Sequence, residues 1–407
     1  MKILMINKFL HPQGGAETYV FKLGDILSAN GHEVQYFGME HEGRCVGNQV
    51  NAYTRKMDFY DGFELSKLTY PVRVIYSSEA RKQIRRVLDD FKPDVCHLNN
   101  FNYQLTPSII LEIRKWEKQT NHRVRVIFTA HDCQLVCPNH LMRNPNTGEN
   151  CEKCAQGAFW HCAASGCVHG SYAWSLAGTL EAYFWKSRKV YRQLDTIICP
   201  SRFMQSKLAY NQDLKEKLIV LHNFVDAVEP KAVQKKDYVL YFGRYSKEKG
   251  IRTLLSVCRD LPDISFVFAG SGPLNREIGG SDNIRNAGFL SGAALEKLIR
   301  EARFSVCPSE WYENCPFSVI ESLMYATPVL GADIGGIPEL IENGVTGELF
   351  ESGSRDDLKR KIRRLWDDRE FTDTCSDNCR KIHFNTPSLY YERLMQIYEG
   401  RRESVRL

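Results

Sequence analysis

Short runs of apolar residues alternate with segments in which apolar residues recur every three or four positions along most of the chain. In the first half this pattern predicts strands at Lys2–Asn7, Glu33–Phe37, Asp94–Leu98, Arg125–Ala130, Thr196–Cys199 and Leu218–Leu221. It predicts helices at Ala16–Asn30, Ser78–Phe91, Thr106–Gln119, Tyr172–Gln193 and Ser201–Tyr210. Strands that alternate with helices form a parallel sheet with helices on both faces. The stretch from about Gly38 to Tyr76 has no clear period and is assigned to no element.

A second alternating series begins at the apolar run Tyr238–Phe242 and continues to about His383. A polar linker is predicted around residues 223–237, and the final segment, Pro387–Glu399, has the pattern of an amphipathic helix. A chain of 407 residues is too long for one ordinary core. We therefore predict an α/β protein with two domains, residues 1–225 and 226–385, followed by a C-terminal segment, residues 386–407.

The composition is that of a soluble globular protein, with 43% apolar and 25% charged residues. The first apolar run is too short for a signal-peptide core, and no run reaches the ~18 residues of a membrane span. A cytoplasmic protein is the prediction. Residues 1–222 carry 28 Lys and Arg against 21 Asp and Glu (+7), whereas residues 223–407 carry 26 against 28 (−2). The basic first half favours peripheral association with an anionic membrane or a lipid diphosphate, although a charge of +7 spread over 222 residues does not exclude an ordinary solvated surface.

Two short segments combine residue types that suit a sugar nucleotide. Arg244 and Lys249 lie five positions apart on a turn from a strand to a helix, where two cations suit a diphosphate. Glu313 lies in the loop after the buried strand 304–307, and Glu321 lies on the second turn of the helix that follows. The first amides of such a helix have no intrahelical partner, so they and the carboxylates suit a ligand rich in hydroxyls. Any one of these charges could be an ordinary surface group, but their place at strand ends favours a binding site.

Further segments occur in a fixed order with these two. They are the turn Gly14-Gly15 after the first strand, His131 after a mid-domain strand, and the runs 223–226, 269–273 and 335–339. The ordered set resembles the retaining glycosyltransferases of family 4, over nearly the whole chain. The resemblance implies the GT-B fold, in which two Rossmann-like domains face each other across a cleft. The first domain would hold the acceptor and the second the nucleotide sugar, and the C-terminal helix would pack back on the first domain.

The candidate residues fall into two sets. The predicted catalytic residues are His131, Arg244, Lys249 and Glu313. The predicted donor-binding residues are Gly14, Gly15, Arg244, Lys249, Gly270, Glu313, Phe317, Ser318 and Glu321. Preset cations stabilise the charge that develops on a leaving nucleoside diphosphate, which is the role of Arg244 and Lys249. The resemblance implies that Glu321 binds the ribose, that Glu313 contacts the donor sugar, and that His131 contacts the donor sugar or orients the acceptor.

Several function classes lack their motifs in this sequence. It contains no Asp-x-Asp, which metal-dependent glycosyltransferases use to hold their ion, so no cofactor is expected for catalysis. It also contains no G-x-G-x-x-G, which counts against a nicotinamide or flavin enzyme. No basic-aromatic repeat points to nucleic acid.

The predicted function is transfer of a sugar from a nucleotide-sugar donor, UDP- or GDP-linked, to a glycan or lipid-linked glycan acceptor in surface polysaccharide assembly. The protein would work in the cytoplasm, with peripheral association at the inner face of the membrane. The alternatives are a catalytically degenerate sugar-nucleotide-binding scaffold and another GT-B activity, such as a sugar-nucleotide epimerase.

A cysteine-rich insert, residues 133–170, departs from the simplest family pattern. It holds six of the 14 cysteines. A reducing cytoplasm disfavours disulfides, and Cys151-x-x-Cys154 has the spacing of a zinc knuckle. We predict one structural zinc ion, with four ligands drawn from Cys137, Cys151, Cys154, Cys162 and Cys167 and with a histidine as a substitute. An iron–sulfur cluster, disulfides and buried thiols are the alternatives.

Overall fold

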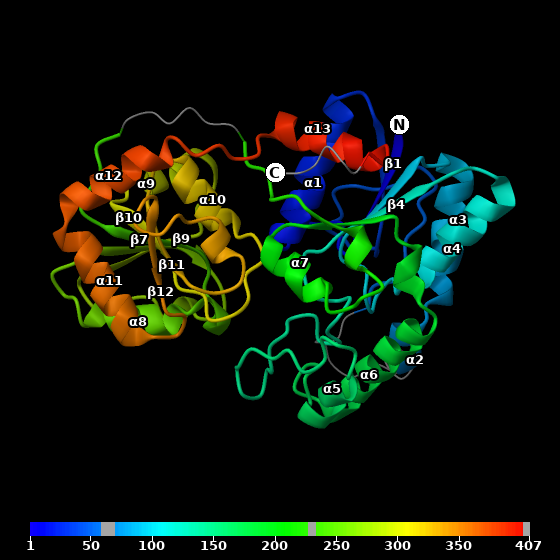
Figure 1. Cartoon of the computed structure of the whole chain (residues 1–407), viewed down its shortest axis with the longest axis horizontal. Helices are drawn as coiled ribbons and strands as arrows, with labels where there is room; N and C mark the ends of the chain where they lie inside the picture. The colour runs from blue at the N-terminus through cyan, green and yellow to red at the C-terminus, as the bar shows by residue number, and fades with distance from the viewer. Residues whose placement is uncertain (58–69, 227–232, 402–407) are drawn as a thin grey trace. The chain divides into compact units, whose positions relative to one another are not determined.

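The computed structural model describes residues 1–57, 70–226 and 233–401 (Figure 1). The chain divides into two compact units: unit 1 is Met1–His222 together with the chain from Ser388 onward, and unit 2 is Asn223–Pro387. The division falls three residues before the predicted boundary. Part of the predicted linker (227–232) and the end of the predicted C-terminal segment (402–407) lie outside the described residues.

Unit 1 is built on a parallel sheet of six strands in the order β2-β1-β3-β4-β5-β6. The strands are β1 (Lys2–Ile6), β2 (Glu33–Phe37), β3 (Val95–Leu98), β4 (Arg125–Thr129), β5 (Thr196–Cys199) and β6 (Leu218–Val220). The helices are α1 (Gly15–Ala29), α2 (Tyr70–Ile75), α3 (Ser78–Phe91), α4 (Ser108–Thr120), α5 (Trp160–Ser165), α6 (Tyr172–Ser187), α7 (Arg202–Leu208) and α13 (Pro387–Tyr398). Every strand predicted for this half is confirmed, with ends that differ by at most one residue.

Unit 2 is built on a second parallel sheet of six strands in the order β12-β11-β10-β7-β8-β9. The strands are β7 (Val239–Arg244), β8 (Phe266–Ser271), β9 (Ile284–Gly288), β10 (Phe304–Cys307), β11 (Val329–Ala332) and β12 (Gly347–Phe350). The helices are α8 (Ile251–Arg259), α9 (Gly292–Glu301), α10 (Phe317–Met324), α11 (Arg355–Asp367) and α12 (Arg369–Cys379), and the 3-10 turn η4 (Lys247–Lys249) precedes α8. The predicted α/β class is therefore confirmed in both units.

Both faces of the unit 2 sheet are covered. Along β7, Val239 and Tyr241 pack in one apolar cluster, whereas Leu240 and Phe242 pack in another. Successive side chains of a strand point to opposite faces, so each cluster occupies one face. This explains why the strand appears in the sequence as a continuous apolar run rather than an alternating one.

The prediction of one long helix over Tyr172–Gln193 is wrong in its second half. Helix α6 ends at Ser187, and residues 190–193 form a separate 3-10 turn. The break lies at Lys189, whose φ of 49° is in the left-handed region that no α-helix continues through. The short helices α2 and α5 were not predicted, because six residues give too little periodicity. Among the described residues, no helix has both the length and the hydropathy that crossing a bilayer requires.

The C-terminal helix α13 packs on unit 1. The hydroxyls of Tyr390 and Tyr19 are 2.7 Å apart, and the Tyr398 hydroxyl lies 2.7 Å from Nδ1 of His97 on β3. Tyr390 and Tyr398 are both buried. These contacts join the last helix of the chain to α1 and to the middle of the first sheet.

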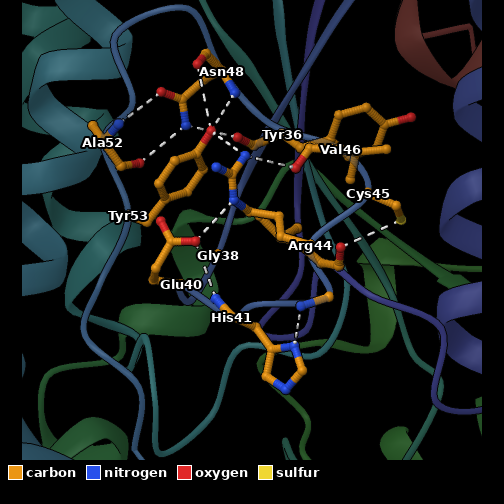
Figure 2. A network of polar contacts seen from close by, with 12 residues as sticks. Tyr36, Gly38, Glu40, His41, Arg44, Cys45, Val46, Asn48, Ala52 and Tyr53 are labelled. Atoms are coloured by element: carbon orange, nitrogen blue, oxygen red, sulfur yellow. Dashed lines mark hydrogen bonds and ion pairs between the residues drawn. The ribbon is translucent and has the colours of Figure 1, made fainter.

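The loop after β2 is held by a network of polar contacts (Figure 2). The side-chain amide nitrogen of Asn48, Nδ2, donates to the backbone carbonyls of Tyr36 and Ala52, at 2.9 and 3.0 Å. The guanidinium of Arg44 donates to the Tyr53 hydroxyl at 2.8 Å and lies 4.0 Å from the centre of that ring. The sequence showed no period here because side-chain contacts and isolated backbone bonds, such as the bridge between Met39 and Thr54, hold this loop in place of a helix or strand.

Candidate active site

The order of strands in unit 2 reverses at β7, which lies between β8 and β10. In open α/β sheets, ligands bind at such a reversal, outside the carboxyl ends of the strands. Arg244 ends β7, and residues 308–316 connect the end of β10 to α10. The two segments that the sequence singled out separately therefore meet at one point of the fold.

Lys249 and Glu313 form an ion pair at this point. Nζ of Lys249 lies 2.5 Å from Oε1 of Glu313, and it also lies 5.4 Å from the centre of the Trp311 ring. The same carboxylate oxygen accepts hydrogen bonds from Oγ of Ser309 at 2.6 Å and from Nε1 of Trp311 at 2.9 Å. Glu313 is only 7% exposed. The carboxylate is thus largely removed from water and is compensated by one cation and two neutral donors.

The pKa values of the two groups follow from this environment. Burial alone raises the pKa of Glu313, but the charge and hydrogen bond of Lys249, with the bonds from Ser309 and Trp311, lower it overall. Burial alone lowers the pKa of Lys249, and the attraction of Glu313 raises it overall. Both groups are therefore charged at neutral pH.

Two glycines allow the backbone to hold this pair. Gly250, with φ of 70°, follows Lys249, and a β-carbon there would lie 1.8 Å from the carbonyl oxygen of Pro308. Gly335, with φ of 63°, packs against Glu313 so closely that a β-carbon would lie 2.3 Å from its carbonyl oxygen. The amide of Gly336 donates to that same carbonyl at 2.8 Å. The Gly335-Gly336 segment, which contributed to the family resemblance, therefore positions Glu313.

Arg244, Lys249, Glu313 and Ser318 line one small pocket at the strand reversal. The Arg244 side chain is exposed, and it makes no hydrogen bond or ion pair with the residues that the structure describes. Ser318 lies in the first turn of α10. The capping residue there is Pro316, whose side chain accepts no hydrogen bond from the free backbone amides of this turn. Of the predicted donor residues in unit 2, these four are brought together.

The other predicted donor residues of unit 2 lie beside this pocket. Phe317 and Glu321 are partly buried on α10, and neither belongs to the pocket lining formed by the described residues. Gly270 pairs with Gly243 across β7 and β8, and a β-carbon on it would lie 1.9 Å from the Gly243 carbonyl oxygen. Gly270 therefore allows the strand end that carries Arg244 to approach β8 closely.

In unit 1, His131 follows β4 and is half-buried. Its Nε2 lies 2.9 Å from Oδ1 of Asn99, and its ring meets the edge of Tyr19 at 4.9 Å between centres. Burial lowers the pKa of His131 to about 3, so the imidazole is neutral at physiological pH. Gly14 caps α1, and Gly15 is its first residue; both are exposed.

Sequence reasoning missed several residues of these sites. Ser309 and Trp311 bond to Glu313, but only the folded loop places them there, and no spacing rule identifies them. Asp132 is the neighbour of His131 and was not among the predicted site residues. Burial raises its pKa to about 6, against the opposing effects of the Lys8 charge and the Gln134 amide. A charged residue directly after a strand was the signal available in the sequence.

The insert places its thiols close to one another. Cys154 and Cys162 are buried in one cluster with Cys167 packed against it. Burial, together with neighbouring thiols, raises the pKa of the Cys137 and Cys154 thiols, each to about 12. Within the described ranges, no three His, Cys, Asp or Glu side chains are grouped closely enough to hold a metal ion. Zinc binding therefore stays a prediction, and it requires the thiols to approach further and to lose their protons.

Two family profiles together cover most of the chain. The profile described as Glycosyltransferase Family 4 matches residues 13–229, and that described as Glycosyl transferases group 1 matches residues 225–382. The first alone covers more than half of the chain.

Similar proteins include characterised and uncharacterised glycosyltransferases. An uncharacterised glycosyltransferase of Methanocaldococcus jannaschii, MJ1178, is 27% identical over 53% of this chain and 62% of its own length. The O-antigen biosynthesis glycosyltransferase WbnH of Escherichia coli is 30% identical over 50% of this chain and 61% of its own. An uncharacterised 42.6 kDa protein from the cps region of Klebsiella pneumoniae is 22% identical over 84% of this chain and 87% of its own. The chain spans less than two thirds of the first two relatives.

Solved structures show the same fold. The Anabaena protein Alr3699/HepE, crystallised with UDP, matches with a TM-score of 0.69 and 16% identity, over 98% of this chain and 100% of its own. Sucrose-phosphate synthase from Thermosynechococcus elongatus matches with a TM-score of 0.69 and 18% identity, over 98% of each chain. The family profiles, these folds and the two parallel sheets agree: the chain belongs to glycosyltransferase family 4 and has the GT-B fold.

Proposed function

We propose that this protein is a retaining glycosyltransferase that moves a sugar from a UDP- or GDP-linked donor to a glycan or lipid-linked glycan in surface polysaccharide assembly. The observation that carries the proposal is the convergence of Arg244, Lys249, Glu313 and Ser318 on one pocket at the strand reversal of unit 2. Relatives named for O-antigen biosynthesis and the cps region, and a fold neighbour crystallised with UDP-glucose, support the choice of pathway and donor.

The two cations would share the donor diphosphate unequally. Arg244 has no partner among the described residues, so its whole guanidinium is available for the phosphate oxygens. Lys249 is already held by Glu313, which fixes its position but compensates part of its charge. Oε1 of Glu313 accepts three hydrogen bonds, which leaves Oε2 for a hydroxyl of the donor sugar. The charge on the leaving diphosphate grows as the glycosidic bond breaks, so both cations stabilise the transition state more than the ground state.

The remaining residues would orient the two substrates. Glu321 would bind the ribose, and the first amides of α10, at Phe317 and Ser318, would bind hydroxyls or a phosphate. Gly14 and Gly15 would let the start of α1 approach the donor. His131 is neutral and hydrogen-bonded, so it suits a positioning role at the donor sugar or acceptor hydroxyl. The acceptor would attack on the face from which the diphosphate leaves, and a phosphate oxygen would take its proton.

Incubation of the protein with nucleotide sugars and candidate acceptors tests the proposal. We expect release of nucleoside diphosphate that depends on both substrates, and a product whose anomeric configuration, read by NMR, is that of the donor. Donor binding without any release in the presence of acceptor extracts would instead identify a non-catalytic scaffold. Inversion at the anomeric carbon would refute the retaining mechanism. A free sugar nucleotide with altered configuration would identify an epimerase.

We also propose that the protein works in the cytoplasm and associates peripherally with the inner face of the membrane. The solvent-facing side of α6 carries Tyr172, Leu176, Leu180 and Tyr183, which lie three or four residues apart and thus on one face. These side chains are exposed, Leu176 by 53%. Exposed basic residues, Lys186, Arg188 and Lys189, follow at the end of the helix. An apolar stripe bordered by cations is typical of helices that lie in an anionic membrane interface.

Sedimentation with lipid vesicles tests this association. We expect binding to vesicles that contain an anionic lipid, weaker binding to zwitterionic vesicles, and loss of binding in the variant Leu176→Ser/Leu180→Ser. Equal sedimentation of that variant and the wild type would exclude α6 as the membrane contact.

For the insert we propose one structural zinc ion, bound by four of Cys137, Cys151, Cys154, Cys162 and Cys167, with no cofactor for catalysis. The packing of Cys154, Cys162 and Cys167 in one cluster supports the proposal. Elemental analysis of protein purified under reducing conditions would find about one zinc per chain. Less than about 0.2 metal per chain, with freely titrating thiols, would refute it.

A further inference from the structure

A second pocket lies in unit 1, at the carboxyl ends of β1 and β2. It has a volume of about 200 Å³. Lys8 follows β1, His41 belongs to the loop after β2, and Gln104 belongs to the loop after β3. The strand order reverses at β1, which lies between β2 and β3. The pocket therefore occupies the ligand-binding position of the first sheet, as the Arg244 pocket does in the second.

The most informative side chain of this pocket is Lys8. It is half-buried, and its ammonium makes no hydrogen bond or ion pair with any residue that the structure describes. The ammonium lies 5.3 Å from the centre of the Phe9 ring. Burial lowers the pKa of Lys8, against the weaker attraction of Asp132 and Glu17. A cation that is withdrawn from water without a partner is unfavourable. An anion in the pocket would remove that penalty.

The other polar groups suit a ligand that carries hydroxyls beside its charge. Oε1 of Gln104 is buried and has no hydrogen-bond partner among the described residues, and neither has Nδ1 of His11. The rings of His11 and His41 stack with 3.7 Å between their centres, and Nδ1 of His41 accepts the amide of Gly43, which leaves the other nitrogen, Nε2, as a donor. A second lysine, Lys56, also lines the pocket.

Among the described residues of the lining, the one carboxylate, that of Glu40, is already compensated. Oε1 of Glu40 accepts from Nε of Arg44 at 3.0 Å and from the backbone amide of His41 at 3.2 Å. Arg44 is in turn fixed by Tyr53 in the network of Figure 2, which also shows His41 at the edge of that network. This wall of the pocket is therefore held in place by the protein itself, and binding would not have to order it.

We propose that this pocket, the Lys8 pocket, binds an acidic group, a phosphate or a carboxylate, carried by the acceptor glycan. The inference rests on the proposed transferase function, whose donor diphosphate is assigned to Arg244 and Lys249 in the other unit. Lys8 and His131 follow strands of the same sheet, and the charge of Lys8 acts on Asp132, the neighbour of His131. An acidic group held at Lys8 would therefore anchor the acceptor near the strand ends where its reacting hydroxyl is expected.

Small acidic sugars serve as probes, because the acceptor itself is not identified. Calorimetry with glucose 1-phosphate, with methyl glucuronide and with neutral methyl glucoside compares a phosphate, a carboxylate and no charge on similar rings. We expect at least one acidic probe to bind at least ~10-fold more tightly than the neutral one, and the stronger of the two identifies the group. In Lys8→Gln this preference should disappear, whereas Lys8→Arg, which keeps the charge, should retain it.

Two further variants locate the binding. Lys118 is exposed on α4 and forms no ion pair with the residues that the structure describes, so Lys118→Gln controls for a general loss of positive charge and should behave as wild type. Arg244→Ala removes the donor-site cation and should leave the preference intact. Equal binding of acidic and neutral probes, no binding of any probe, an unchanged preference in Lys8→Gln, or loss of the preference in Arg244→Ala would each overturn the inference.

The titration of UDP and GDP separates this inference from the proposed function. Lys8→Gln should bind the preferred nucleotide as tightly as wild type does. If the wild type binds a nucleotide but Lys8→Gln keeps the preference for the acidic probes, the inference about the Lys8 pocket is refuted and the proposed function is not. Failure of both nucleotides to bind the wild type would refute the proposed function. A loss of nucleotide affinity in Lys8→Gln would assign the pocket to the donor and overturn its assignment to the acceptor.

Discussion

The Lys249–Glu313 pair gives the sharpest prediction, because its stability role and its ligand role can be separated. Replacement of Lys249 by Met would leave a carboxylate that is 7% exposed without its cation. Removal of one partner of a buried ion pair costs ~3–5 kcal/mol. The bonds from Ser309 and Trp311 would remain, and the Lys249 side chain is 25% exposed, so we expect the lower end, about 3 kcal/mol.

Arg244 provides the matched control. It is a cation of the same pocket, but it is exposed and forms no ion pair with the described residues, so Arg244→Met should change stability by less than about 0.5 kcal/mol. Both variants should nevertheless lose at least ~10-fold in turnover, about 1.4 kcal/mol of transition-state stabilisation. The double variant Lys249→Met/Glu313→Leu should recover most of the lost stability, because no charge then remains buried.

Urea unfolding of the full chain, with hydrogen exchange resolving β7, β10 and α10, measures these differences. The pH dependence supplies a second check. The pKa of Glu313 is held below its ordinary value of 4.5, so the stability that it contributes is present above that pH and is lost as the pH falls. In Lys249→Met the pKa of Glu313 should rise instead. Acidification from pH 7 should therefore reduce the difference in unfolding free energy between this variant and the wild type. Equal losses of unfolding free energy in Lys249→Met and Arg244→Met would refute the reasoning. A loss in the double variant as large as the sum of the losses in the two single variants would refute it as well.

Three other predictions concern separate features. Glu321→Ala should weaken nucleoside diphosphate binding by ~10-fold, about 1.4 kcal/mol; unchanged affinity by calorimetry would contradict the ribose assignment. EDTA should leave donor binding and transfer intact, and a strict, rapidly reversible need for Mg²⁺ or Mn²⁺ would overturn the metal-free mechanism. Glu181 is 3% exposed, and burial raises its pKa to about 8. Between pH 4.5 and 8 its carboxyl group is therefore ionised in the unfolded chain but neutral in the folded chain, so the free energy of unfolding falls as the pH rises through that window. Glu181→Gln should therefore be more stable than the wild type by roughly 3 kcal/mol at pH 7, and a difference that does not change with pH in urea titrations would contradict this.

Much of the fold was predictable because the strands are buried. Each of the six strands of unit 1 was located to within one residue. A run such as Thr196–Cys199 is buried on both faces of the sheet, so it appears in the sequence as a short, nearly continuous apolar run. The helix that was predicted through Gln193 ends at Ser187, because the backbone conformation of Lys189 is not encoded by the apolar period. Loops held by side-chain contacts, such as that of Asn48 and Tyr53, leave no periodic signal.

The candidate site was predictable only in part. Arg244, Lys249 and Glu313 were found because residue type and position after a strand are properties of the sequence. Their mutual geometry was not predictable. The ion pair gives Lys249 a second role, the compensation of the buried Glu313 carboxylate, beside its predicted role at the donor diphosphate. Lys8 was not predicted as a site residue, because only the folded chain shows that its half-buried ammonium has no ion-pair partner among the described residues.

The sequence by itself determined the class of the fold, the order of its elements and the family, because all three depend on local patterns and on the order of short motifs. The tertiary structure decided which of these residues act together. Parallel strands bring their carboxyl ends to one edge whatever the length of chain between them, so Lys249 and Glu313, 64 residues apart, share one hydrogen bond. Burial then sets the electrostatics. Lysine is a solvated surface charge at position 118 and an ion-pair partner at position 249, and at position 8 it is a pocket cation with no ion-pair partner among the described residues.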